Sequence, residues 1–165
     1  MSTLLIVMGV SGCGKTTFAQ ALAEKLNYLY LDADDFHSAE NKAHMASGKP
    51  LTDAMRLPWV NTMKEFLQKK AEQGVSCTLA FSGLKKEHRN ILRQTDMQTR
   101  YIFLDGSKEL ITQRMTTRKD HFMPSSLIDS QFSSMERPTD EDDVIFVDIA
   151  PPIQDVLTTI LQGLK

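Results

Sequence analysis

The sequence has only two cysteines, Cys13 and Cys77, so it carries no disulfide framework. Its fully apolar runs are short, as in residues 4–8, and a membrane helix needs about 20 apolar residues, which excludes a span. Lys and Arg number 19 against 21 Asp and Glu, and a net charge of −2 gives no overall basic footprint for nucleic acid. Residues 1–3 lack the basic region of a secretory signal, so we expect a cytoplasmic protein.

What is present is the pattern of an α/β domain. The 165 residues favour one compact domain, residues 1–165, and 41% of them are hydrophobic. Short apolar runs predict strands at residues 3–8, 28–31, 75–81, 101–104 and 144–149. Helical spacing predicts helices at residues 16–26, 84–94, 108–118 and 153–164. A further helix is expected to begin with Pro58 in its first turn and to end at about residue 71. Strands that alternate with helices indicate a parallel sheet covered on both faces, with ligands at the carboxyl ends of the strands.

Two polar stretches, residues 34–57 and 119–143, interrupt this alternation. Long irregular segments in a compact domain are often binding segments or lids. We therefore expect residues 34–60 to bind a substrate and residues 119–135 to form a lid. Surface loops with a few helical turns are the alternative.

One motif stands between the first predicted strand and the first predicted helix. Residues 9–16 match the pattern G-x-x-x-x-G-K-[ST]. We expect this motif and the residue after it to contact a nucleotide through Gly9, Val10, Ser11, Gly12, Cys13, Gly14, Lys15, Thr16 and Thr17. Glycines let the backbone amides turn toward phosphate oxygens, and the helix N-terminus adds its positive end. Lys15 is expected to reach the β- and γ-phosphates of ATP as a catalytic cation, and the Thr16 hydroxyl to ligate Mg²⁺.

Acidic residues follow the second predicted strand. Asp32, Asp34 and Asp35 crowd like charges together, which is unfavourable unless a cation or a substrate relieves them. Phosphoryl transfer needs one carboxylate to accept the proton of the acceptor hydroxyl and another to hold Mg²⁺. Asp34 is the candidate base and Asp32 the candidate metal ligand. A solvated acidic turn that caps the next helix is the alternative.

Cys13 lies inside the motif, next to Gly14 and Lys15. The loop amides and Lys15 create a positive potential, which lowers a thiol pKa. The sequence therefore predicts a reactive Cys13 that MgATP protects from alkylation, whereas Cys77 lies in a buried strand and reacts slowly. The alternative is that the Cys13 side chain points away from the phosphates into the sheet.

Several longer segments resemble the small gluconate kinases of the P-loop superfamily. They are GVSGCGKTT (9–17), DADDFHSAENKAHMASGKPLTD (32–53), RLPWV (56–60), FSGLKKEHRNILR (81–93) and RMTTRKDHFMPSSLIDSQFSSME (114–136). The resemblance implies transfer of the ATP γ-phosphoryl group to the 6-hydroxyl of D-gluconate. It also implies a homodimer and a three-layer, shikimate-kinase-like fold: a five-stranded parallel sheet of order 2-3-1-4-5, helices on both faces, and a lid.

Gluconate has one carboxylate and five hydroxyls, which call for basic and polar side chains respectively. Arg56, Lys85 and Arg89 are candidates for the carboxylate, with solvated basic side chains as the alternative. His37 could contact a hydroxyl, and the resemblance adds Gln131. One position departs from the family, because Met55 stands where an acid is usual, and this predicts weaker acceptor binding.

Arg114 and Arg118 lie four residues apart, on one face of a predicted helix. In related kinases one such arginine stacks on adenine and another meets the phosphates, so Arg118 is a further catalytic candidate. Salt bridges to Asp120 or Glu109 are the alternative.

Three other functions remain open at this point: a kinase for another small acid or polyol such as shikimate, a nucleoside monophosphate kinase, and a non-catalytic nucleotide-binding regulator.

Overall fold

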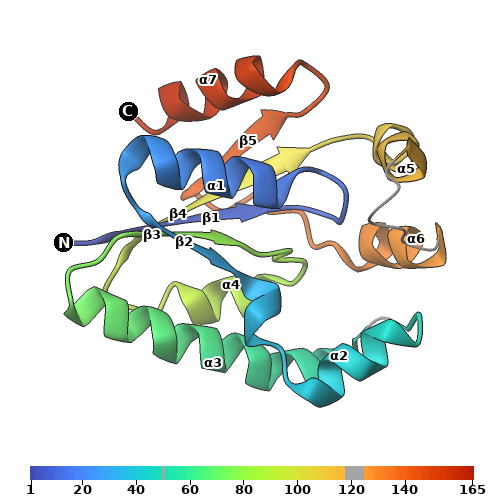
Figure 1. The fold of residues 1–165 in the computed structure, drawn as a ribbon, viewed down its shortest axis with the longest axis horizontal. Helices are drawn as coiled ribbons and strands as arrows, with labels where there is room; N and C mark the ends of the chain where they lie inside the picture. The colour runs from blue at the N-terminus through green and yellow to red at the C-terminus, as the bar shows by residue number, and fades with distance from the viewer. Residues whose placement is uncertain (50, 118–124) are drawn as a thin grey trace.

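A computed structural model describes residues 1–49, 51–117 and 125–165. Its centre is an all-parallel sheet of five strands in the order β2-β3-β1-β4-β5. The strands are β1 (Thr3–Met8), β2 (Leu29–Asp32), β3 (Cys77–Ala80), β4 (Gln98–Asp105) and β5 (Val144–Asp148). The predicted fold class and strand order are therefore confirmed (Figure 1).

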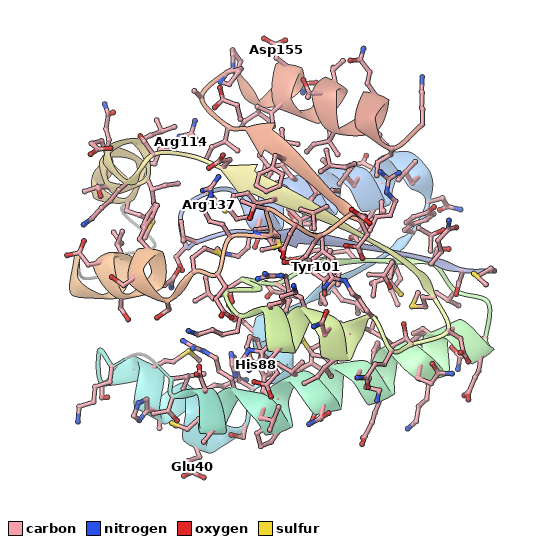
Figure 2. The ribbon with its side chains drawn as sticks, turned by 180° about the vertical axis from the view of Figure 1, so that it is seen from behind. Glu40, His88, Tyr101, Arg114, Arg137 and Asp155 are labelled. Carbon is pink, nitrogen blue, oxygen red and sulfur yellow. The ribbon has the colours of Figure 1, made fainter. Side chains whose placement is uncertain are left out.

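Helices cover both faces of the sheet (Figure 1). On one face lie α1 (Lys15–Leu26) and α7 (Ile153–Gly163), whose buried side chains share one core with the strands. On the other face lie α3 (Asp53–Glu72) and α4 (Lys86–Leu92), which bury a second core that includes Trp59, Met63 and Leu92. Tyr101 of β4 lies beneath α4, and its hydroxyl donates to the carbonyl of Arg89 at 2.9 Å (Figure 2).

The remaining helices stand at the carboxyl end of the sheet, where the predicted binding segments lie. They are α2 (Ala39–Ala46), α5 (Lys108–Thr117) and α6 (Ser125–Ser134). The polar stretches are thus more helical than the sequence predicts. Ser38 explains the start of α2, because its hydroxyl accepts the N–H of Asn41 at 3.1 Å as an N-cap.

Two element boundaries differ from the prediction by more than two residues. Helix α3 begins at Asp53, capped by the Thr52 side chain, so Pro58 lies inside the helix and not in its first turn. The hydrogen bond that proline cannot donate would end on the carbonyl of Ala54, an exposed residue that water can reach. Strand β4 begins at Gln98, earlier than predicted, because polar residues 98–100 also pair with β1.

No helix in the described ranges is both long enough and apolar enough to cross a membrane.

Candidate active site

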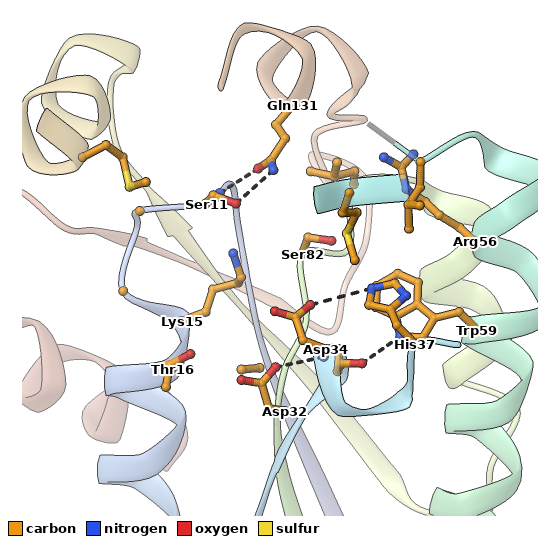
Figure 3. Close-up of a pocket in the computed structure, with 18 of the residues that line it drawn as sticks. Ser11, Lys15, Thr16, Asp32, Asp34, His37, Arg56, Trp59, Ser82 and Gln131 are labelled. Atoms are coloured by element: carbon orange, nitrogen blue, oxygen red, sulfur yellow. Dashed lines mark hydrogen bonds and ion pairs between the residues drawn. The ribbon is translucent and has the colours of Figure 1, made fainter. Parts of the chain in front are cut away.

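A cavity of about 870 Å³ opens at the carboxyl ends of β1, β2 and β3 (Figure 3). It brings together residues from segments far apart in the chain: the loop before α1, the acids after β2, the start of α3 and helix α6. Its lining includes Ser11, Gly12, Gly14, Lys15, Thr16, Thr17, Asp32, Asp34, His37, Lys49, Arg56, Trp59, Ser82 and Gln131.

The loop between β1 and α1 forms one wall of this cavity. Gly9 and Gly12 have φ angles of 146° and 86°, a region that side chains other than glycine rarely adopt. A Cβ on Gly9 would also stand 2.8 Å from the Cys13 sulfur, and one on Gly12 would stand 2.7 Å from the sulfur of Met115. The glycines are therefore required both by the backbone and by the packing around it.

Lys15 is the first residue of α1. Its ammonium group donates to the carbonyls of Gly9 at 3.0 Å and Val10 at 3.2 Å. These contacts fold the side chain over the loop, so the charge lies at the helix N-terminus, where backbone N–H groups already favour an anion. Loop, helix end and Lys15 together form a site suited to phosphate.

For Cys13 the structure agrees with the alternative prediction, in which the side chain points away from the phosphates, and not with the predicted lowering of the thiol pKa. The side chain is fully buried in the core beneath the loop, with the sulfur against Gly9. Burial raises the pKa of the Cys13 thiol, and the nearby Lys15 charge only partly opposes that effect. Cys77 is also fully buried, as predicted, and burial raises its pKa to about 11.

Asp32 at the end of β2 and Asp34 just after it form the opposite wall. Strand β3 lies between β2 and β1, so the acids stand two strands away from the loop. The Asp32 carboxylate accepts the N–H of Asp34 at 2.9 Å, so it caps the short 3₁₀ turn Ala33–Phe36 and lines the cavity at the same time. Thr16 faces Asp32 across the floor of the cavity (Figure 3). This pair offers a hydroxyl and a carboxylate oxygen, which are the ligand types Mg²⁺ prefers.

Asp34 extends from the 3₁₀ turn into the cavity, and its side chain is 81% exposed. The cavity wall removes part of its hydration, and the neighbouring Asp32 carboxylate repels a second negative charge. Both effects raise the pKa of Asp34, and Lys15 acts against them. A carboxylate that is accessible and more basic than usual is suited to accept a proton.

Arg56 supplies positive charge from the second turn of α3. Only 14% of its side chain is exposed, and its guanidinium donates to Asp53 at 3.3 Å. Asp53 therefore gives Arg56 an acidic partner, although Met55 stands where the resemblance implies an acid. Sequence reasoning missed Lys49, which lines the same cavity from the segment between α2 and α3. The signal was its place in residues 32–53, one of the segments that resemble the gluconate kinases.

Arg89 is not available to a substrate, which corrects its predicted role. The side chain is fully buried, and its Nε and Nη2 atoms donate to the Glu141 carboxylate at 3.0 and 2.7 Å. Its Nη1 and Nη2 atoms also donate to the carbonyls of Gly83 and Glu136 at 2.6 and 2.8 Å. Lys85 lies outside the cavity as well, in a shallow groove beside Asp53 and Glu136.

Of the two arginines predicted to contact the adenine and the phosphates, the structure describes only Arg114. Arg114 of α5 lies near the carboxyl ends of β4 and β5 and donates to the carbonyl of Ile149 at 2.7 Å (Figure 2). Arg118 and the first part of the predicted lid, residues 119–124, fall outside the described residues. The rest of that lid is mainly α6, which supplies Gln131 to the cavity.

Comparisons with known proteins agree with this geometry. Residues 4–138 match the AAA domain family. The chain is 42% identical to the thermosensitive gluconokinase of Escherichia coli, over 92% of this chain and 81% of that protein. The crystal structure of a gluconokinase from Sinorhizobium meliloti superposes with a TM-score of 0.90 at 36% identity, over 98% and 91% of the two chains.

A more distant structure bears on the fold alone. Shikimate kinase from Aquifex aeolicus has a TM-score of 0.61 at 19% identity, over 98% of this chain and 96% of that one. The shared fold, the phosphate-binding loop and the long, nearly full-length similarity together establish that the chain belongs to the gluconokinase family.

Proposed function

We propose that this chain transfers the γ-phosphoryl group of ATP to the 6-hydroxyl of D-gluconate. The observation that carries the proposal is the order of charges along the cavity. The cationic loop with Lys15 stands at one end, the Asp34 carboxylate stands between, and Arg56 stands on the acceptor side (Figure 3), while Lys49 adds a second positive charge to the cavity lining. Gluconate has the complementary order, with a reactive hydroxyl at one end and a carboxylate at the other.

The roles of the residues follow from this order. Lys15 and the loop amides stabilise the negative charge that develops on the transferred phosphoryl group. Asp34 accepts the proton of the attacking hydroxyl, and its raised pKa makes it a stronger base than an ordinary aspartate. Arg56 holds the substrate carboxylate, since a half-buried guanidinium forms strong charge-assisted hydrogen bonds. Residues 34–60 thus form the acceptor side of the domain.

Thr16 and Asp32 are the residues that would hold Mg²⁺, which when bound neutralises charge on the phosphates. Arg114 and Arg118 are proposed for the adenine and phosphate side, and helix α6 for part of a lid. The family resemblance supports a homodimer, which sedimentation measurements would test. Two unpaired, buried cysteines support a location in the reducing cytoplasm.

A coupled assay of ADP release over a panel of acceptors tests the proposal. The panel contains gluconate, other aldonates, shikimate, glucose and sorbitol. We expect gluconate to have the highest kcat/KM, and sorbitol, which lacks the carboxylate, to be poorer by about 100-fold. A higher kcat/KM for shikimate than for gluconate would show that the protein is a kinase for a different acid. ATP binding without turnover on any acceptor would indicate a regulator.

Arg56→Met tests the carboxylate site in the same assay. Removal of a charged hydrogen bond costs about 1.5–3 kcal/mol, so KM for gluconate should rise about 10- to 100-fold while kcat changes little. The weak activity on sorbitol should stay the same. Lys69→Met, an exposed position on the same helix, is the matched control. An equal loss on gluconate and sorbitol would contradict the assignment.

A further inference from the structure

Asn41 is a buried polar residue on α2 with no role in the predictions from sequence. It is only 7% exposed. Its Nδ2 atom donates to the carbonyl of Met55 at 3.2 Å and lies 3.4 Å from Nδ1 of His37. A carbonyl oxygen can only accept, so the amide nitrogen of Asn41 must be on that side. The second N–H of the same nitrogen then faces His37.

This contact determines where His37 carries its proton. The imidazole is 8% exposed, and burial, with smaller effects of Lys42 and Arg56, lowers its pKa to about 4. The ring is therefore neutral at pH 7 and has a single N–H. Because Nδ1 accepts from Asn41, that proton is on Nε2.

The orientation of the ring is fixed as well. His37 stacks on Trp59 with ring centroids 4.0 Å apart and planes inclined by 20°. Trp59 is itself held by a 2.7 Å hydrogen bond from its indole N–H to the carbonyl of Ala33. The imidazole therefore cannot turn without breaking two contacts, and Nε2 faces the acids of the cavity (Figure 3).

Nε2 of His37 lies 3.8 Å from Oδ1 of Asp34. That distance is too long for a direct hydrogen bond, but one oxygen atom can bridge two groups at this spacing. A hydroxyl there accepts a hydrogen bond from Nε2–H and donates its own proton to Asp34. Its remaining lone pair stays free to attack phosphorus.

We propose that Asn41 is a positioning residue that holds His37 in the Nε2–H tautomer, so that His37 and Asp34 clamp the attacking hydroxyl of the acceptor from both sides. In the step, the new bond forms between the hydroxyl oxygen and the γ-phosphorus, the bond to the ADP oxygen breaks, and the proton passes to Asp34. His37 keeps its proton throughout. The identity of the acceptor in this inference rests on the proposed function. The tautomer of His37 does not, because it follows from contacts within the protein alone.

The tautomer is measured on the free enzyme by ¹⁵N NMR of the histidine side chains, with His37→Gln to assign the signal. We expect an Nε2–H imidazole in the unaltered protein. Asn41→Asp offers only acceptors and should move the proton to Nδ1, and Asn41→Leu should give a mixture. A wild-type His37 protonated on Nδ1 would overturn the proposal whatever the substrate proves to be.

Kinetics with the most active acceptor of the panel test the clamp. Glutamine can place a side-chain N–H near the position of Nε2, so His37→Gln should keep kcat/KM within about 3-fold, whereas His37→Leu should lose about 10-fold or more. Asn41→Leu should resemble His37→Leu. Equal losses in His37→Gln and His37→Leu would overturn the clamp.

Ser38→Ala is the matched control for stability, since it removes the N-cap of α2 but leaves the Asn41 side chain in place. It should lower the melting temperature without changing the tautomer or kcat/KM of the folded enzyme. If Ser38→Ala changes both in the same way as Asn41→Leu, Asn41 acts only through the stability of α2 and the proposal fails.

Discussion

The side-chain amide of Gln131 binds the backbone N–H and the side-chain hydroxyl of Ser11. Its Oε1 accepts the backbone N–H of Ser11 at 2.7 Å, and its Nε2 donates to the Ser11 hydroxyl at 2.9 Å. The two residues are 120 positions apart in the chain, so this pair joins α6 to the phosphate-binding loop. Ser11 lies in the loop that we propose binds phosphate, so in the ATP complex the Gln131 oxygen would compete with a phosphate oxygen for the Ser11 N–H.

Replacement of Gln131 by alanine should affect the free enzyme more than the nucleotide complex. Two hydrogen bonds are lost, about 1 kcal/mol each, so the melting temperature of the free enzyme should fall by about 4–8 °C. With saturating ATP the difference from wild type should shrink, because phosphate replaces the amide. Thermal melts with and without ATP measure this. The exposed Gln154→Ala on α7 is the control, and an equal fall in both conditions would show that the contact persists in the complex.

Asp34 should determine the acidic limb of the pH–rate profile. The base must be ionised, and its pKa is raised, so kcat should begin to fall at a higher pH than the value of 3.8 for an ordinary aspartate would give. Asp34→Asn should lose kcat and this limb together while ATP binding persists. A variant with normal kcat would return Asp34 to the role of a solvated turn residue.

The same shift makes a prediction about stability. A carboxyl group whose pKa is raised on folding contributes stability that is fully present below its unfolded pKa and is lost as the pH rises through its folded pKa. Asp34→Asn should therefore be at least as stable as wild type at pH 7, with the advantage gone in acid. Urea denaturation of both proteins, at pH 7 and at a pH below the unfolded pKa of aspartate, measures the difference in the free energy of unfolding.

The part of the site that could be predicted from sequence is the part built from contiguous residues. The loop from Gly9 to Thr16 is specified by local backbone geometry, and the alternation of strands and helices gives the layers of the fold. Asp34 and Arg56 were also identified, because each follows a recognisable element or segment.

The remainder depends on contacts between distant segments, which a single sequence does not display. The Cys13 side chain is buried in a core that it shares with residues far along the chain, such as Leu104 and Ile111. The role of Arg89 is set by Glu141, 52 positions further along the chain. The tautomer of His37 is set by Asn41, four residues further along the chain on α2, and the orientation of the Asn41 amide depends in turn on the Met55 carbonyl. In each case the residue type indicated a role, but the sequence did not show which distant residue would be its partner.

Cys13 should be inert in the native enzyme, against the expectation from its sequence context. The thiol is fully buried and its raised pKa disfavours the thiolate, so an alkylating reagent should label both cysteines only as the protein unfolds. Peptide mass spectrometry after alkylation should find no rapid labelling of Cys13 with or without MgATP. Rapid labelling that MgATP prevents would mean that the loop opens to expose the sulfur in solution.

Arg89→Met should cost stability and leave substrate binding intact. The side chain of Glu141 is 5% exposed and binds both Arg89 and Arg93 at 2.7 Å. Burial alone would raise the pKa of Glu141, but hydrogen bonds from the two arginines outweigh it and hold the pKa below its usual range. Removal of one partner from a buried pair costs about 3–5 kcal/mol, and Arg93 should keep the loss near the lower figure.

The double variant Arg89→Met/Glu141→Leu separates this role from substrate binding. A buried ion pair replaced by apolar side chains of similar size is often neutral, so the double variant should recover much of the stability that Arg89→Met loses. Urea denaturation gives the free energy of unfolding, and the acceptor assay gives KM for gluconate, which should match wild type in both variants. A KM raised tenfold or more with normal stability would instead place the Arg89 guanidinium at the acceptor, and would require the Glu141 pair to open when the substrate binds.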